Sequence, residues 1–413
     1  MPASAMPEIA EAYVRLALAV GRHDPNYVDA YYGPPEWKAA ADSVTVPLDT
    51  LAAHVDAVRK RLTETAIPAA ADALDSLRHT YLDRQLSAMA ARLQMLQGKK
   101  LRFDEESEAL YNAVAPTHPE SYLQDLIAKL DPLLPGTGSV ADRYRAFRSE
   151  FIVPAAKVDT VFKTAIAECR ARTIKYVSLP ANESFTVEYV KNKPWSGYNW
   201  YQGGSKSLIQ VNIDLPIYID RAIDLACHEG YPGHHVYNAL LESALVRGKG
   251  WTEFSIYPLF SPQSLIAEGT ANYGIVMAFP GGERAAFERD HLYPLAGLDP
   301  ALAERYARIQ EVAGELSYAG NEAARRYLDG EIDAKAAADW LVRYALSTPE
   351  AAIQRVKFFD TYRSYVINYN LGRDLVGTYV DREAGAGAPA ERRWQVFSGL
   401  LASPRLPGGL QER

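Results

Sequence analysis

The segment CHEGYPGHH, residues 227–235, holds three of the eight histidines in this 413-residue chain. Glu229 directly follows His228, as in the H-E-x-x-H motif, in which two histidines bind zinc and the glutamate is the general base. The spacing differs, because His234 and His235 lie six and seven residues after His228 instead of four. On an unbroken helix, six residues turn a side chain to another face, and seven carry it about 10 Å along the axis.

Pro232 and Gly233 predict that the helix deforms inside this segment. Proline lacks an N–H group and its ring clashes with the carbonyl four residues earlier, here that of His228. A bulge that loops out two residues would bring His234 to the position of the second metal ligand. His235 would then face the substrate or a residue behind the metal, and an exchange of roles between the two histidines stays open. Histidines that cap the negative end of a helix are the alternative, but Glu229 is disfavoured there.

A catalytic zinc ion takes three protein ligands and keeps one position open. Glu268, in the segment SLIAEGTANY (264–273), is the candidate third ligand. Small and apolar neighbours place it on a buried helix face, where a carboxylate needs a partner. Lysine and arginine are absent between residues 250 and 282, so a metal ion is the better partner.

The elements that position these residues are mostly helices. Apolar residues recur every three or four positions between Leu74 and Leu96, which is typical of one helix face. Alternation and β-forming residues predict strands at 185–190, 198–201 and 208–213, separated by glycine-containing turns. The fold class expected is therefore mainly α, a large helical metallopeptidase-like fold with one small antiparallel β-sheet beside the zinc-binding helix.

Two regions are expected. Residues 1–180 form a helical N-terminal region, and residues 181–413 form a catalytic region. The catalytic region is divided into a small sheet at 183–214, zinc helices at 221–280 and a helical C-terminal part.

The composition of the chain argues against nucleic acid and membranes as binding partners. The net charge of −7 and pI near 5.7 give no basic footprint for nucleic acid. Two cysteines make no disulfide framework and favour a reducing compartment. Charged residues interrupt the apolar N-terminal segment, so an amphipathic helix is expected in place of a signal peptide. No apolar run reaches the roughly 18 residues of a membrane span. We therefore expect a cytoplasmic protein without membrane contact, and the sequence does not indicate an oligomeric state.

HEGYPGHH followed by AEGTANY resembles the domain-of-unknown-function 885 family of bacterial metallopeptidases, whose pattern is HExxPGHH and then EGxAxY. The fragment 369–372, YNLG, resembles the family's Y-K-I-G segment. The layout also resembles the thimet oligopeptidase and thermostable carboxypeptidase folds, in which an edge strand holds extended peptide. The resemblance implies zinc at His228, His234 and Glu268, with Glu229 as general base, and it constrains the reaction type more than the substrate. We expect one zinc ion per chain and a short peptide or a small amide as substrate.

Other residues are predicted to bind substrate or stabilise the tetrahedral oxyanion. Tyr369 is the leading donor to the oxyanion because of its motif, with Tyr365 and Tyr273 behind it. Arg373 lies one helical turn after Tyr369 and is predicted to hold a substrate carboxylate. The remaining predicted substrate contacts are Tyr198, Asn199, Tyr365 and His235.

Two other functions compete with peptide hydrolysis. A zinc hydrolase of non-peptide amides or esters would use the same metal chemistry. A non-catalytic helical binding protein with a vestigial metal site is the second, and the presence of Glu229 argues against it. Zinc is the default ion for a His/His/Glu set, with manganese and cobalt as alternatives.

Overall fold

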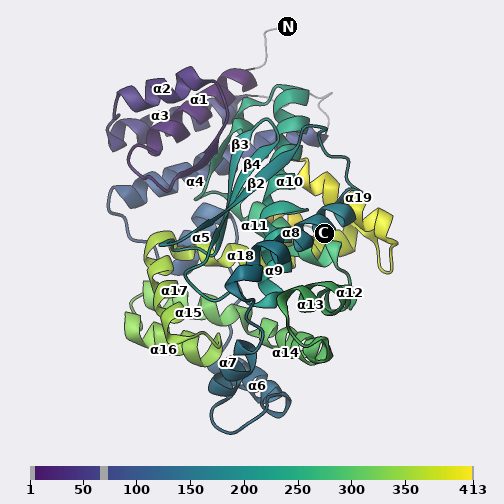
Figure 1. The fold of residues 1–413 in the computed structure, drawn as a ribbon. Coiled ribbons are helices and arrows are strands. Elements are labelled where there is room, and N and C mark those ends of the chain that lie inside the picture. The colour runs from purple at the N-terminus through teal and green to yellow at the C-terminus, as the bar shows by residue number, and fades with distance from the viewer. Residues whose placement is uncertain (1–4, 66–72, 412–413) are drawn as a thin grey trace.

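The computed structural model describes residues 5–65 and 73–411, and Figure 1 shows the chain as a predominantly helical body with small sheets. The predicted mainly α fold is confirmed. The first helices are α1 (Met6–Val20), α2 (Pro35–Ser43), α3 (Leu48–Glu64), α4 (Ala73–Leu96), α5 (Phe103–Tyr111), α6 (Glu120–Leu130), α7 (Val140–Ser149) and α8 (Val158–Thr173). The later helices are α9 (Ile219–Leu225), α10 (His234–Leu241), α11 (Pro262–Ala278), α12 (Glu283–Phe287), α13 (Tyr293–Ala296), α14 (Ala303–Gly314), α15 (Ala319–Leu328), α16 (Ala334–Tyr344), α17 (Pro349–Tyr362), α18 (Ile367–Ala384), α19 (Ala390–Leu401) and α20 (Pro407–Gln411).

The three predicted strands are present as β2 (Ser184–Val190), β3 (Gly197–Gly203) and β4 (Lys206–Asn212). The prediction of an antiparallel sheet is wrong for one pair: β4 lies in the centre, antiparallel to β3 but parallel to β2. A two-residue turn with positive φ at both positions joins β3 and β4 as a hairpin. After β2 the chain first forms the far edge strand β3 and then returns as the central strand β4, which gives the order β2-β4-β3. The residue pattern within each strand does not predict this order.

A second sheet was not predicted. The short strand β1 (Val28–Tyr31) pairs antiparallel with β5 (Ile256–Pro258). This pair joins the N-terminal region to the segment just before α11, so the region 1–180 is not purely helical. The division of the chain at residue 180 stays a prediction.

Helices α11 and α18 cross closely at the centre of the molecule (Figure 1). Two glycines permit the contact: a Cβ atom on Gly269 would lie 2.5 Å from the carbonyl carbon and oxygen of Gly372. This approach explains the glycine that follows Glu268 and the glycine that ends the YNLG fragment. It also places the ends of both motifs beside one another.

The N-terminal segment forms the predicted amphipathic helix, which is α1. Among residues 5–65 and 73–411, no helix is long and apolar enough to cross a membrane.

Candidate metal centre and cavity

The histidine segment is not a continuous helix. Helix α9 runs into one π-helical turn, Ala226–Gly230, and the backbone then breaks before α10 begins at His234. The predicted deformation is confirmed, but it is a break between two helices and not a bulge within one. Glycine is required at position 233, because a Cβ atom there would overlap the carbonyl oxygens of His228 and Cys227. The Gly233 N–H donates to the Cys227 carbonyl at 2.9 Å, which fixes the break.

The break brings three predicted metal ligands together. The Nε2 atoms of His228 and His234 lie 3.1 Å apart. Glu268 Oε2, from α11, lies 3.2 Å from the first and 3.7 Å from the second. Ligands of one tetrahedral zinc ion, each about 2.1 Å from the metal, are separated by roughly 3.4 Å. The three distances therefore fit a single shared ion.

The chemistry of the donor atoms also fits a cation. Glu268 Oε2 is buried and has no hydrogen bond of acceptable geometry among the described residues. Burial raises the pKa of Glu268, but the two histidines outweigh it and hold the carboxylate ionised, with a pKa well below its usual range. Burial lowers the pKa of His228, while Glu268 and Glu229 outweigh that effect and raise it to about 9. The site concentrates negative charge around two imidazoles, as a divalent ion requires.

Neighbouring side chains orient the ligands. His228 Nδ1 donates to Asn272 Oδ1 at 3.0 Å, which turns Nε2 toward the other candidate ligands. Asn272 in turn donates to the Tyr369 carbonyl at 3.0 Å. The Tyr365 hydroxyl donates to Glu268 Oε1 at 2.7 Å. The ligand set is thus held by α11 and by the segment around the start of α18.

Glu229 lies beside this cluster with a free carboxylate. The residue is only 4% exposed, and its carboxylate has no side-chain hydrogen bond among the described residues, so only burial and nearby charges act on it. Burial raises its pKa, because the charged form is disfavoured there. The start of β3 packs against it, since a Cβ atom on Gly197 would lie 2.8 Å from Glu229 Oε1. Asn199 donates to the Glu229 backbone carbonyl at 2.7 Å, so this residue positions the motif as well as lining the cavity.

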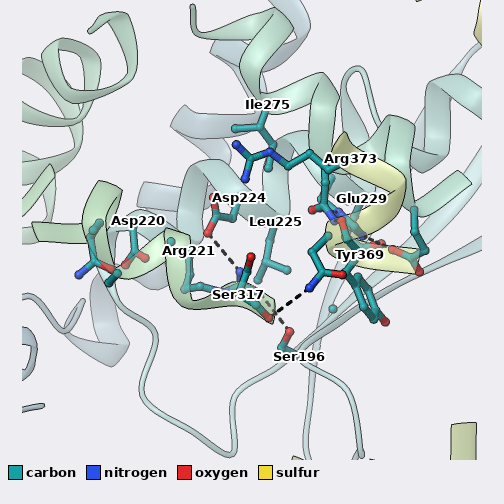
Figure 2. Close-up of a pocket in the computed structure, with 18 of the residues that line it drawn as sticks. Ser196, Asp220, Arg221, Asp224, Leu225, Glu229, Ile275, Ser317, Tyr369 and Arg373 are labelled. Carbon is teal, nitrogen blue, oxygen red and sulfur yellow. Dashed lines mark hydrogen bonds and ion pairs between the residues drawn. The ribbon is translucent and has the colours of Figure 1, made fainter. Parts of the chain in front are cut away.

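A cavity of about 1740 Å³ opens onto the cluster. Figure 2 shows Glu229, Tyr369 and Arg373 among the residues of its wall. The predicted residues that line it are His228, Glu229, His234, Glu268, Tyr198, Asn199, Tyr365, Tyr369 and Arg373. The Tyr369 hydroxyl has no side-chain hydrogen bond within the described part of the chain, whereas the Tyr365 hydroxyl donates to Glu268.

His235 does not reach the cavity, and its predicted substrate contact is corrected. The side chain is fully buried, with Nε2 3.0 Å from Glu183 Oε2 and Nδ1 2.9 Å from the Ser207 hydroxyl. Burial raises the pKa of Glu183, but hydrogen bonds from His235, Tyr231 and Arg170 outweigh it and lower that pKa to about 2. His235 therefore connects the motif to the sheet. The break at Gly233 turns the consecutive side chains of His234 and His235 in different directions.

Tyr273 is also absent from the cavity wall. Its hydroxyl accepts a hydrogen bond from Arg393 at 2.6 Å, on the side of α11 that faces α19. A role in oxyanion stabilisation is therefore excluded by position.

Three residues of this site were missed by the sequence analysis. Asp29, from β1, lines the cavity and accepts a hydrogen bond from the Tyr198 hydroxyl. Burial, with smaller contributions from the metal-site carboxylates, raises the pKa of Asp29 to about 8. Asn272 lies inside the EGTANY segment, so the motif itself was the available signal. The third missed residue is Arg355, from α17, which also lines the cavity. Neither Asp29 nor Arg355 has a local sequence signal, because only tertiary packing brings them to the cavity.

The chain shares a fold with known structures. It is similar to the "putative lipoprotein from Colwellia psychrerythraea" at 13% identity, with a TM-score of 0.53 over 90% of this chain and 70% of that one. It is also similar to the carboxypeptidase of Pyrococcus furiosus at 11% identity, with a TM-score of 0.50 over 96% of this chain and 90% of that one. No protein-family profile and no curated protein sequence matches the chain. At these identities the likeness defines a carboxypeptidase-like helical fold and leaves activity to the site itself.

Proposed function

We propose that this protein is a metal-dependent hydrolase that cleaves amide bonds in short peptides, with zinc as its ion. The observation that carries the proposal is the meeting of three ligand atoms within 4.8 Å of one another beside an unpaired glutamate, on the wall of one large cavity. We also propose membership of the domain-of-unknown-function 885 family, on the HExxPGHH and EGxAxY segments. The carboxypeptidase-like fold is compatible with both proposals.

The residues divide the chemistry between them. His228, His234 and Glu268 would hold the ion, which supplies Lewis-acid activation of a carbonyl group and of water. Glu229 accepts a proton from the attacking water and delivers it to the leaving amine. Its burial suits this exchange, because a raised pKa brings a carboxylate closer to neutral pH. Tyr369, with a free hydroxyl, donates to the developing oxyanion.

The number of ligands argues for catalysis over a purely structural role. A structural zinc site is closed by four protein ligands, often including cysteine. Among the described residues only three candidate ligands gather here. Cys227 adjoins the first ligand in sequence but is buried and interacts with the thiol of Cys169 instead. A position for water and substrate is therefore available.

The test compares zinc-loaded wild type with Glu229→Gln on short blocked peptides and on small amides and esters. We expect peptide cleavage by the wild type. The variant should retain one zinc per chain and lose about 10²- to 10⁴-fold in turnover. Glu311→Gln, a change to an exposed cavity glutamate, is the matched control and should leave turnover unchanged. Equal turnover by wild type and Glu229→Gln would refute the mechanism, and turnover of esters or non-peptide amides alone would refute the substrate class.

A further inference from the structure

Five arginines line the cavity: Arg221, Arg284, Arg308, Arg355 and Arg373. Arg221 and Arg284 both pair with Asp224, at 3.1 and 2.8 Å. Two others, Arg308 and Arg373, are exposed, so water solvates their charges. Arg355, on α17, is different: it is partly buried, yet its guanidinium makes no hydrogen bond or ion pair within residues 5–65 and 73–411.

Aromatic rings surround this guanidinium instead of carboxylates. Its central carbon lies 4.4 Å from the ring centre of Phe358 and 5.6 Å from those of Phe359 and Tyr369. Such rings stabilise a cation but leave its five N–H donors unused. Burial lowers the pKa of Arg355, because the charged form is poorly solvated there. A buried charge without a partner is costly, so an anion from outside the chain would stabilise this cation.

The guanidinium belongs to the same end of the cavity as the metal centre. It faces the ring of Tyr369, whose backbone carbonyl accepts a hydrogen bond from the Asn272 amide. The oxygen of the same Asn272 side chain accepts a hydrogen bond from His228 Nδ1. The charges of Arg355 and Glu268 are close enough to interact. A ligand held by Arg355 would therefore extend toward the three metal ligands.

We infer that Arg355 binds a carboxylate group of the substrate and so selects peptides that carry such a group. The planar fork of arginine matches a carboxylate with two parallel hydrogen bonds. The inference rests on the proposed function and deepens it, since it gives Arg355 the role predicted for Arg373. The carboxylate has two sources, the C-terminus of the peptide or an acidic side chain.

The experiment measures peptide binding to zinc-loaded Glu229→Gln protein by calorimetry. The ligands are an N-acetylated alanine peptide with a free C-terminus, its C-terminal amide, and an amide with a glutamate side chain at its last residue. We expect a carboxylate ligand to bind about 10- to 100-fold more tightly than the alanine amide. Adding Arg355→Met should abolish that preference, and adding Arg308→Met, an exposed cavity arginine, should preserve it.

Tighter binding of the peptide with a free C-terminus would identify the C-terminus as the bound carboxylate, and tighter binding of the glutamate amide would identify an acidic side chain. Absence of any preference, including absence of binding by all three peptides, would overturn the inference, as would a preference that survives Arg355→Met. If the preference is present but the wild type cleaves no peptide, only the proposed function fails.

Stability gives a second, independent readout. Arg355 has no hydrogen bond or ion pair among the described residues, and a methionine of similar length can keep the contact with the surrounding rings. Arg355→Met should therefore leave the urea midpoint unchanged or raise it. A structural arginine would behave in the opposite way. A lowered midpoint for Arg355→Met would show that the residue supports the fold, and would overturn the inference.

Discussion

The close crossing of α11 and α18 makes Gly269 a sensitive position. In the Gly269→Ala variant, the new Cβ would lie 2.5 Å from backbone atoms of Gly372, against at least 3.4 Å for an ordinary contact. The backbone of a packed helix does not yield as a side chain does, so the helices must separate by roughly 1 Å. Overpacking of this kind costs about 3 kcal/mol, and alanine returns about 1 kcal/mol through helix propensity. We expect a net loss of about 2 kcal/mol in the free energy of unfolding.

The same separation should weaken metal binding. Glu268 precedes Gly269, and the Asn272 that orients His228 lies on the same helix, so a shift of α11 disturbs two of the three ligands. Misplaced ligand support typically costs 10- to 100-fold in affinity.

Two assays test this prediction: urea unfolding in the presence of chelator, and zinc affinity by competition with a chromophoric chelator. Gly399→Ala is the control, because that exposed glycine in α19 has nothing within 4 Å of an added Cβ and should gain about 0.5–1 kcal/mol. Wild-type stability and zinc affinity in Gly269→Ala would refute the packing argument.

Two further predictions concern groups around the metal centre. Asn272→Leu removes the hydrogen bond to His228 and should weaken zinc binding about 10- to 100-fold while the circular dichroism spectrum is retained; unchanged affinity would contradict the orienting role. Glu183 has a folded-state pKa of about 2 and an ordinary value of 4.5, so its contribution to stability is complete above about pH 4.5 and is lost as the pH falls toward 2. Between those values the urea midpoint of the wild type should fall more steeply than that of Glu183→Gln, and parallel slopes would contradict the assignment.

The candidate metal ligands could be picked out from the sequence because their signals are local. His228, Glu229 and His234 share one short segment, and Pro232 with Gly233 indicates a deformed helix. Glu268 was predicted because it lies on a buried helix face and no lysine or arginine lies near it in the sequence to pair with it. The direction of His235 could not be predicted, because it depends on the backbone angles taken at the break.

Other parts of the site depend on tertiary packing. Asp29 reaches the cavity only because β1 pairs with β5, which lies more than 200 residues later. Arg355 lies on a helix whose pattern shows no special feature, and the role proposed for it rests on the absence of a hydrogen-bond or ion-pair partner among residues 5–65 and 73–411. The order of the strands in the sheet likewise follows from chain crossing and not from the alternation within each strand.

The most direct test of the central claim is an anomalous difference map at the zinc absorption edge, from a crystal of zinc-loaded protein. We predict one peak per chain, about 2.1 Å from Nε2 of His228, Nε2 of His234 and one oxygen of Glu268, with a remaining position open to solvent. No peak at this place, a peak bound by other residues, or an ion enclosed by four protein ligands would contradict a catalytic three-ligand site.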